Sequence, residues 1–549
     1  MDLLELNILK KIEPVYKKSF IITFLIAIIV YFTIISNLFW GNHDWENIQK
    51  SIILNESLYE CRFAATILQT IFCLKLIPYI IYLSDITILI ISLFMIADYW
   101  NVPKKVSNLV IFSLFWILMP STLSILYYQA LSLGIICSVF FSILSLKLCL
   151  KINNKKNKCL KILYFLLSII FLYVFVLGTY PVALNIILVL IMGKLLIEFK
   201  NSNFQLIIFK EFFKKYKFFI CNILISLIFI ISTFYILKYF NILNENFYTI
   251  KLTYIDMIFN RLLFVNKLFF NSLISCDPFI GIYSKILLLF ILGFVLFIFL
   301  RQLKNTNYSV KNKIIKFLTV FILFYLLFLG SLLSFLISSG LNEITPRVLH
   351  FGFDFVFLFC ISIILNETNL KIKNICVIII FLFIYNSAIN NMYAQKVEYL
   401  SFKNELLLQN RLFMRITNDK NFDINKKYLY CQIGQYENFN KRFYIGNYGN
   451  AKNDELLYIL FVSPDSPSSG LKYLADKDFI FDGDFYSYDI DDNFDEQMYD
   501  ELYDFIMNKA KVYPSKDSIF ISEHYILVVF DKLYLDFLKT KLSKRFNSK

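Results

Sequence analysis

Residues 19–40 read SFIITFLIAIIVYFTIISNLFW. This run of 22 residues carries no charge, and its length matches the roughly 20 apolar residues that a helix needs to cross a bilayer. Basic residues precede the run, and no small-residue cleavage site accompanies it. We therefore expect a retained first membrane span at this position, and not a cleaved signal peptide.

The overall composition places the chain among membrane proteins. Of its 549 residues, 58% are hydrophobic and only 17% are charged, and the mean hydropathy is +0.61. A soluble globular chain is closer to half apolar and about a quarter charged, and a disordered chain would be richer in charge. Sixty-one Phe and 36 Tyr are too many for a surface that faces water. We expect a polytopic α-helical membrane protein.

Apolar runs of membrane-spanning length recur along residues 1–392, and we expect eleven spans. They cover residues 19–40, 81–99, 107–126, 130–150, 162–179, 181–199, 218–240, 281–300, 317–338, 348–365 and 374–392. A weaker run at 64–80 is interrupted by Lys75 and Pro78, and we interpret it as an interfacial or re-entrant helix on the outer face. If that run were a twelfth span, every later loop would change sides.

The distribution of basic residues selects between these topologies, because Lys and Arg are enriched in cytoplasmic loops. With eleven spans and a cytoplasmic N-terminus, 25 of the 34 Lys and Arg in residues 1–392 fall in six cytoplasmic segments. A twelfth span would scatter them to both sides. We therefore expect a cytoplasmic N-terminus and residues 393–549 outside the cytoplasm. The basicity belongs to the membrane part, so the expected partner is the lipid bilayer and not nucleic acid.

Residues 393–549 have the pattern of a separate soluble domain. An amphipathic helical stretch continues to about Thr417, a strand-like run covers Lys427–Ile433, and a β-like segment covers Ser518–Phe530. A basic helix closes the chain. We expect a small α/β or α+β domain here, following a transmembrane domain over residues 1–392.

Signatures of cofactor, nucleotide and metal chemistry are missing from the sequence. Its ten Cys include no CxxC pair, which argues against a zinc site or a disulfide framework. No P-loop, GxGxxG, GxSxG or HExxH occurs, so ATP-driven transport and serine hydrolase chemistry have no support. We expect no cofactor and no metal.

Two outer loops, residues 41–80 and 241–280, are too long to be simple turns, and loops of this length usually carry function. Directly after the first span, the first loop opens with Gly41-Asn42-His43-Asp44-Trp45-Glu46-Asn47. Asp44 is a candidate general base, because a carboxylate at the edge of a partly dry cavity can accept a proton from a hydroxyl. Asp44 also fits the N-cap of a helix over Trp45–Ser57, and the two roles do not exclude each other.

Basic residues on the outer loops are candidates for binding an anion. Arg62 lies in Tyr59-Glu60-Cys61-Arg62-Phe63. Its planar guanidinium matches phosphate oxygens, although an arginine beside aromatic residues is also a common membrane-interface anchor. The second loop offers Arg261 and Lys267, which either belong to a solvated face or bind an anionic ligand.

The tenth predicted span carries ionisable residues in an apolar segment. Arg347, His350 and Asp354 are spaced i, i+3 and i+7 and therefore share one helical face. Intramembrane ionisable residues are costly unless they are paired or hydrated, so they tend to mark function. Glu343 precedes them, and a structural pair between helices is the alternative. Tyr180, in a short outer turn, lines a cavity or belongs to the aromatic belt of the membrane interface.

Together these elements resemble the bacterial glucosyl transferase type II family, whose members modify O-antigen and have the GT-C architecture. The resemblance rests on four short segments spread over nearly the whole chain. They are Asp44-Trp45-Glu46, Cys61-Arg62-Phe63, Pro346-Arg347 at the start of a late span, and Ala388–Arg415 together with Val512-Tyr513-Pro514-Ser515. In the second segment the family has a Gly-Arg-Trp-like element, and Cys61 replaces its Gly.

The resemblance implies a glucosyltransferase that takes a sugar from a polyprenyl-phosphate donor on the periplasmic side. The acceptor would be a lipid-linked or surface glycan such as O-antigen. Asp44 would deprotonate the acceptor hydroxyl, which attacks the anomeric carbon with inversion, and Glu46 would assist. Arg62 and Arg347 would neutralise the leaving phosphate. Six further residues would contact the substrates: His43, Trp45, Tyr180, Arg261, Lys267 and Glu343.

Other classes of function stay open. A polymerase or ligase of lipid-linked oligosaccharides would also use outer loops and arginines, but it does not require an Asp at the exit of the first span. A permease or flippase without bond chemistry predicts broken helices and charges near the middle of the membrane. For that class the sequence offers Asp98 and Asp354. A surface-assembly scaffold whose tail binds partners is a further alternative.

Overall fold

The computed structural model describes most of the predicted transmembrane domain and parts of the tail. The described residues are 13–37, 64, 78–126, 129–154, 156–240, 258–274, 282–337, 346–423, 426, 428–433, 481–486, 503–523, 525–530 and 532–547. They belong to two compact units that divide between Ala394 and Gln395. We call the described residues up to Ala394 unit 1 and those from Gln395 onward unit 2.

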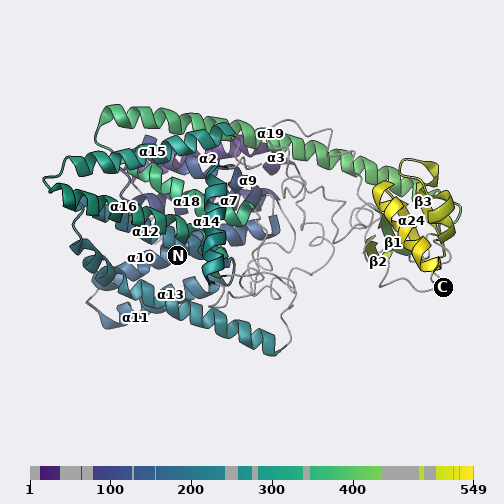
Figure 1. The fold of residues 1–549 in the computed structure, drawn as a ribbon, viewed down its shortest axis with the longest axis horizontal. Coiled ribbons are helices and arrows are strands. Elements are labelled where there is room, and N and C mark those ends of the chain that lie inside the picture. Colours follow the sequence, from purple (N-terminus) through teal and green to yellow (C-terminus); the bar gives the residue numbers. More distant parts are fainter. Residues whose placement is uncertain are drawn as a thin grey trace, which may run out of the picture. The chain divides into compact units, whose positions relative to one another are not determined.

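Unit 1 is a bundle of helices (Figure 1). Its first half contains α2 (Pro14–Val30), α3 (Phe32–Ser36), α7 (Pro78–Tyr99), α8 (Val106–Ile117), α9 (Pro120–Leu126), α10 (Gln129–Asn154), α11 (Lys158–Ile170) and the π-helical turn η1 (Phe171–Leu177). Its second half contains the 3-10 turn η2 (Pro181–Ala183), α12 (Leu184–Asn201), α13 (Ile207–Tyr239), α14 (Ile258–Ile274), α15 (Ile282–Lys304), α16 (Val310–Ser331), α17 (Leu333–Ile337), α18 (Pro346–Leu365) and the first part of α19 (Leu370–Thr417).

Within the described residues, seven helical segments are long and apolar enough to cross a membrane. They are α7, α10, α11 with η1, α13, α15, α16 and the first part of α19, and each coincides with a predicted span. The chain is therefore a multi-pass helical membrane protein. The other four predicted spans fall on shorter or interrupted helices. They are α2 with α3, α8 with α9, α12, and α18.

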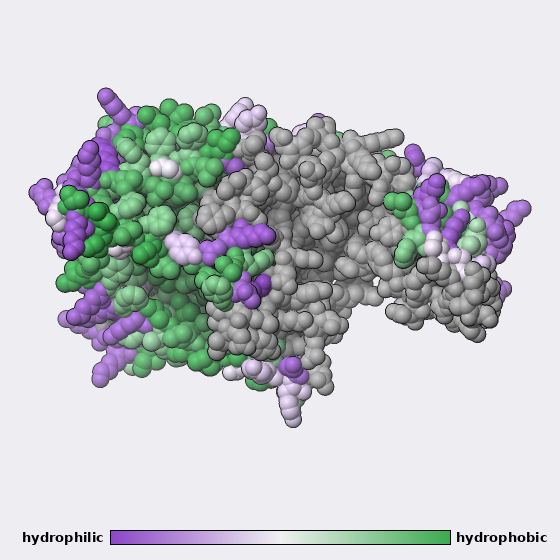
Figure 2. All heavy atoms as spheres, in the orientation of Figure 1, coloured by the Kyte–Doolittle hydropathy of each residue, from purple (hydrophilic) through white to green (hydrophobic). Residues whose placement is uncertain are grey.

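The surface of unit 1 is apolar where a soluble protein would be polar. Ile228 on α13 is 61% exposed, Phe321 on α16 is 60% exposed, and Phe381 on α19 is 62% exposed. Figure 2 shows a broad apolar belt on this unit, with hydrophilic side chains gathered at one end. Because so large an exposed apolar surface is unfavourable in water, this belt faces the hydrocarbon of the bilayer.

The lysine-rich connections of unit 1 lie together at that hydrophilic end, which we call the basic end. Lys104 Nζ lies 2.9 Å from Glu13 Oε1, and Lys147 Nζ lies 2.8 Å from Asp98 Oδ2. Further links join Lys215 to Glu198, Asn153 to the Lys215 carbonyl, Gln302 to the Lys200 carbonyl, and Tyr308 to the Asn203 carbonyl. Five of the six segments that we expect in the cytoplasm therefore share one end of the bundle.

Unit 2 contains a four-stranded sheet with the order β2-β1-β4-β3. Strand β1 (Tyr428–Ile433) pairs in parallel with β2 (Phe481–Tyr486) on one side and with β4 (Tyr525–Val529) on the other. Strand β3 (Ile519–Ile521) pairs antiparallel with β4. Every residue of β4 is buried, as expected for a strand covered on both faces.

Helices cover both faces of this sheet. On one face, η5 (Phe505–Lys509) and α24 (Lys532–Asn547) pack against alternate residues of β4, with Leu535, Leu538 and Leu542 in the core. On the other face, the last part of α19 contributes Leu408, Leu412 and Ile416. The described part of unit 2 is thus a three-layer α/β arrangement. Helix α19 ends at Thr417, where the predicted helical stretch also ends.

Candidate functional site

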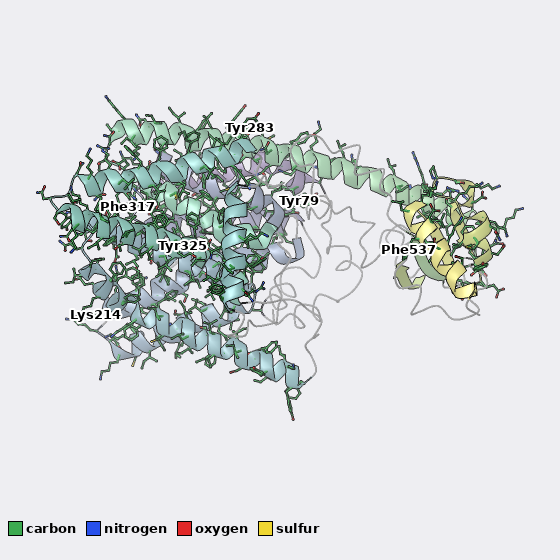
Figure 3. The ribbon with its side chains drawn as sticks, viewed as in Figure 1. Tyr79, Lys214, Tyr283, Phe317, Tyr325 and Phe537 are labelled. Atoms are coloured by element: carbon green, nitrogen blue, oxygen red, sulfur yellow. The ribbon has the colours of Figure 1, made fainter. Side chains whose placement is uncertain are left out.

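We call the end of unit 1 opposite the basic end the loop end, because the predicted outer loops start and finish there. Helices alternate in direction between short connections, so α3, η1 and α17 finish there, and α7, α12 and α18 begin there. In Figure 3, Tyr79 and Tyr283 lie toward the loop end and Lys214 lies at the basic end. The candidate site is built from these helix ends.

A turn after η1 is hydrogen-bonded to Ala64, a residue of the predicted first outer loop. The N–H of Gly178 donates to the Tyr173 carbonyl at 2.9 Å and closes the π-helical turn. The N–H of Ala64 donates to the Gly178 carbonyl, also at 2.9 Å. Ala64, which belongs to the predicted first outer loop, is therefore bonded to the loop end.

Tyr180 lies in the same turn and is buried, with 4% of its surface exposed. Its N–H donates to the Val176 carbonyl at 3.0 Å, and Thr179 Oγ1 donates to the Phe175 carbonyl at 2.5 Å. These bonds hold the turn close to the preceding helix. Tyr180 is consequently a buried residue of this turn and not an exposed aromatic of the membrane interface.

Four helices, α12, α16, α17 and α18, meet beside this turn. Asn185, near the start of α12, donates from Nδ2 to Ser334 Oγ at 3.0 Å, and its Oδ1 accepts from the Ser334 N–H at 2.9 Å. Gly352 of α18 packs against both Asn185 and Ser331, the last residue of α16. This close contact fixes how far α18 extends toward the loop end, and the first turn of α18 contains Arg347.

A buried polar network lies deeper, where α8 breaks before α9. Asp354 of α18 is fully buried and accepts a hydrogen bond from Ser121 Oγ. The carbonyls freed by the break also have partners: Tyr31 Oη donates to Ile117 O at 2.5 Å, and Asn391 Nδ2 donates to Leu118 O at 3.0 Å. Partnered carbonyls allow a helix to break inside the membrane.

A second buried carboxylate lies between α7 and α10. Asp85 is fully buried, and its Oδ2 accepts from Ser132 Oγ at 2.6 Å. In the part of the chain that the structure describes, Asp85 Oδ1 has no hydrogen-bond partner. Asp85 was not predicted as a functional residue, although an Asp inside the apolar run 81–99 was a usable signal. Asp98, which was a predicted candidate, forms an ion pair with Lys147 at the basic end.

The predicted site residues fall into three groups. Six lie outside the described residues: His43, Asp44, Trp45, Glu46, Arg62 and Glu343. Arg347 is described only by its backbone in α18. Tyr180, Arg261 and Lys267 are described with their side chains, and Arg261 is buried in α14 whereas Lys267 is exposed. Arg261 and Lys267 therefore lie on different faces of α14.

The described ranges contain no group of three or more His, Cys, Asp or Glu side chains close enough to hold a metal ion. The described residues place a hydrogen-bonded turn at the loop end, and two carboxylates, Asp85 and Asp354, are buried in the same helical bundle. Comparison with known proteins finds no matching family model, no matching curated protein and no matching solved structure.

Proposed function

We propose that this protein is a membrane glycosyltransferase similar to the glucosyl transferase type II family. It moves a sugar from a polyprenyl-phosphate donor to a lipid-linked or surface glycan. The observation that supports this most is the bond between Ala64 and Gly178. The chain between Asn37 and Ala64 carries the acidic turn, and both of its described flanks lie at the loop end.

In the proposed reaction, Asp44 takes the proton of an acceptor hydroxyl, assisted by Glu46. The hydroxyl oxygen forms a bond to the anomeric carbon while the bond from that carbon to the donor phosphate breaks, with inversion. Polyprenyl phosphate leaves with the bonding electron pair, and Arg62 and Arg347 stabilise its charge. His43, Trp45, Tyr180 and Glu343 contact the sugar or the acceptor. No metal or cofactor takes part in these steps.

The proposed topology has eleven spans in the bacterial inner membrane. The lysines gathered at the basic end support a cytoplasmic location for that end, because basic residues are enriched on the cytoplasmic side. The loop end and unit 2 are then extracytoplasmic, on the side where GT-C enzymes take their lipid-linked donors.

Polar features inside the bundle favour a second candidate, a permease or flippase. Helices break at Tyr31 and after Ile117, and the carboxylates of Asp85 and Asp354 are buried between helices. Broken helices and buried ionisable groups are typical of transporters. This candidate differs from the first because it predicts movement of a substrate with no new bond.

One experiment separates the two candidates. The purified protein and its Asp44→Asn variant are reconstituted with a polyprenyl-phosphate sugar and a lipid-linked glycan acceptor, and sugar transfer is measured. Loss of a general base lowers turnover by about 10²–10⁴-fold, and we expect donor binding to persist. Asp98→Asn is the matched control, since Asp98 is at the basic end, and it should retain turnover. Equal turnover by Asp44→Asn and the unmodified protein would exclude the proposed mechanism.

A further inference from the structure

Helix α14 runs in a different direction from the spans of unit 1. Figure 1 draws α14 transverse to α15 and α16, and it packs against α15, α16 and α17. Its 17 residues do not qualify as a membrane-crossing segment. A helix that crosses the spans near their loop end runs along the membrane surface and not through the bilayer.

The two faces of α14 differ in what covers them. Val265 and Leu268 face the bundle and are 0% and 2% exposed. On the opposite face, Phe259 is 69% exposed, Leu263 is 55% exposed, and Lys267 is exposed one turn further on. These three residues are spaced by four positions and form one stripe, which we call the outer stripe.

The outer stripe is next to a surface that already faces lipid. Tyr325 of α16 donates from its hydroxyl to Asn266 Oδ1 of α14 at 2.9 Å. Tyr325 lies on the same helix as Phe321 and Ile322, which are 60% and 54% exposed within a membrane-crossing segment. The apolar belt of α16 is therefore joined by a direct hydrogen bond to the helix that carries the outer stripe.

The chemistry of the outer stripe matches the boundary between acyl chains and headgroups. Two large apolar side chains exposed on one helix face are unfavourable in water but stable at that boundary. A lysine at the edge of such a face keeps its stem on apolar surface while its ammonium reaches phosphate oxygens. The pattern is that of a helix lying in the membrane interface.

We propose that α14 is an interfacial helix whose outer stripe binds membrane phospholipid. Phe259 and Leu263 insert beside the acyl chains, and Lys267 contacts the headgroup phosphate. This assignment does not depend on the glycosyl transfer reaction, and it gives Lys267 a membrane partner instead of the substrate. It explains why Arg261 and Lys267 are on different faces, because only one of them faces the lipid.

Photo-crosslinking from the outer stripe tests this proposal. A benzophenone amino acid replaces Leu263 in the full-length protein, which is reconstituted in vesicles of phosphatidylglycerol and phosphatidylethanolamine. After illumination, we expect a peptide that carries a phospholipid at position 263. The same substitution at Phe321 of α16 is the positive control, because that position faces hydrocarbon. Crosslinks from position 263 only to protein or to none, with phospholipid captured at 321, would overturn the proposal.

A second comparison tests the role of Lys267. One lysine near an anionic surface contributes about 1 kcal/mol, which corresponds to about a fivefold preference. In Lys267→Ala, the enrichment of phosphatidylglycerol over phosphatidylethanolamine among the adducts at position 263 should fall by about fivefold. Lys267→Arg should retain the enrichment. An unchanged lipid ratio in Lys267→Ala would contradict the headgroup contact.

Discussion

A Cβ atom added to Gly352 would lie 2.2 Å from the carbonyl oxygen of Ser331. Real Cβ atoms do not approach oxygen this closely, so α18 touches the end of α16 at the one place where its side chain is absent. The same Cβ would be 2.8 Å from Asn185 Cβ of α12. Gly352 therefore sets the position of α18 against two other helices at the loop end.

Replacing Gly352 by Ala should destabilise unit 1. The backbone of Ser331 cannot rotate away as a side chain could, so α18 has to shift, and overpacking of this kind costs about 1–3 kcal/mol. Gly293→Ala is the matched control, because a Cβ at Gly293 meets nothing within 4 Å. Alanine at an open helical position should stabilise by about 0.5–1 kcal/mol. Unfolding in mixed micelles measures both, and equal effects would show that the close approach is not structural.

The paired hydrogen bonds of Asn185 and Ser334 should couple α12 to α17. Polar contacts between membrane helices contribute about 0.6 kcal/mol on average, with a maximum of about 1.7 kcal/mol. A double-mutant cycle with Asn185→Ala and Ser334→Ala should give a coupling energy near that average. It reports the bond from Asn185 Nδ2 to Ser334 Oγ, because Ser334→Ala keeps the backbone N–H that donates to Asn185 Oδ1. Simple additivity of the two losses would mean that this side-chain bond does not hold the helices together.

The Asp85→Asn variant should distinguish movement of a substrate across the membrane from sugar transfer. Asp85→Asn keeps the shape of the side chain and removes its ability to ionise, so we expect the fold to survive. If the protein moves a substrate across the membrane by using this buried carboxylate, substrate movement in sealed vesicles should stop while sugar transfer in detergent persists. Asp98→Asn is the control, because its ion pair is partly exposed and contributes only about 0.2–1 kcal/mol. Normal movement in Asp85→Asn would remove the support that Asp85 gives to the permease candidate.

The stability of unit 2 should depend on the last part of α19. Leu412 is fully buried in the core that α19 shares with the sheet, so Leu412→Ala should cost about 2–5 kcal/mol. Met414, two residues further on, is 53% exposed, and Met414→Ala should change stability by no more than about 0.5 kcal/mol. Limited proteolysis of the full-length protein, followed at sites in the tail, reports the difference. Equal protease resistance of the two variants would argue against the packing of α19 on the sheet.

The positions of most helices could be predicted from the sequence, because long apolar runs have few alternatives in a membrane protein. Seven predicted spans coincide with membrane-crossing helices, and β1 begins within one residue of the predicted strand start at Lys427. The breaks at Tyr31 and Ile117 were not predicted, since both lie inside uniformly apolar runs. Pro120 was a local signal for the second break, because proline removes a helix hydrogen bond.

Features that depend on contacts between distant helices could not be predicted. Asn185, Gly352 and Asn391 have no local pattern in the sequence that marks them, and their importance comes from partners on other helices. The second outer loop carried no specific motif, so the direction of α14 was not predicted. The assignments of Asp44 and Arg62 stay predictions, because both residues lie outside the described part of the chain.

The location of the acidic turn is the most direct test of the whole account. Asn42→Cys adds a thiol to this turn, and Cys159, exposed on α11 at the basic end, is the reference. Intact cells are treated with a thiol reagent that cannot cross the inner membrane, before and after permeabilisation. We expect position 42 to react in intact cells and Cys159 to react only after permeabilisation. Reaction of Cys159 in intact cells, with position 42 protected until permeabilisation, would contradict the account.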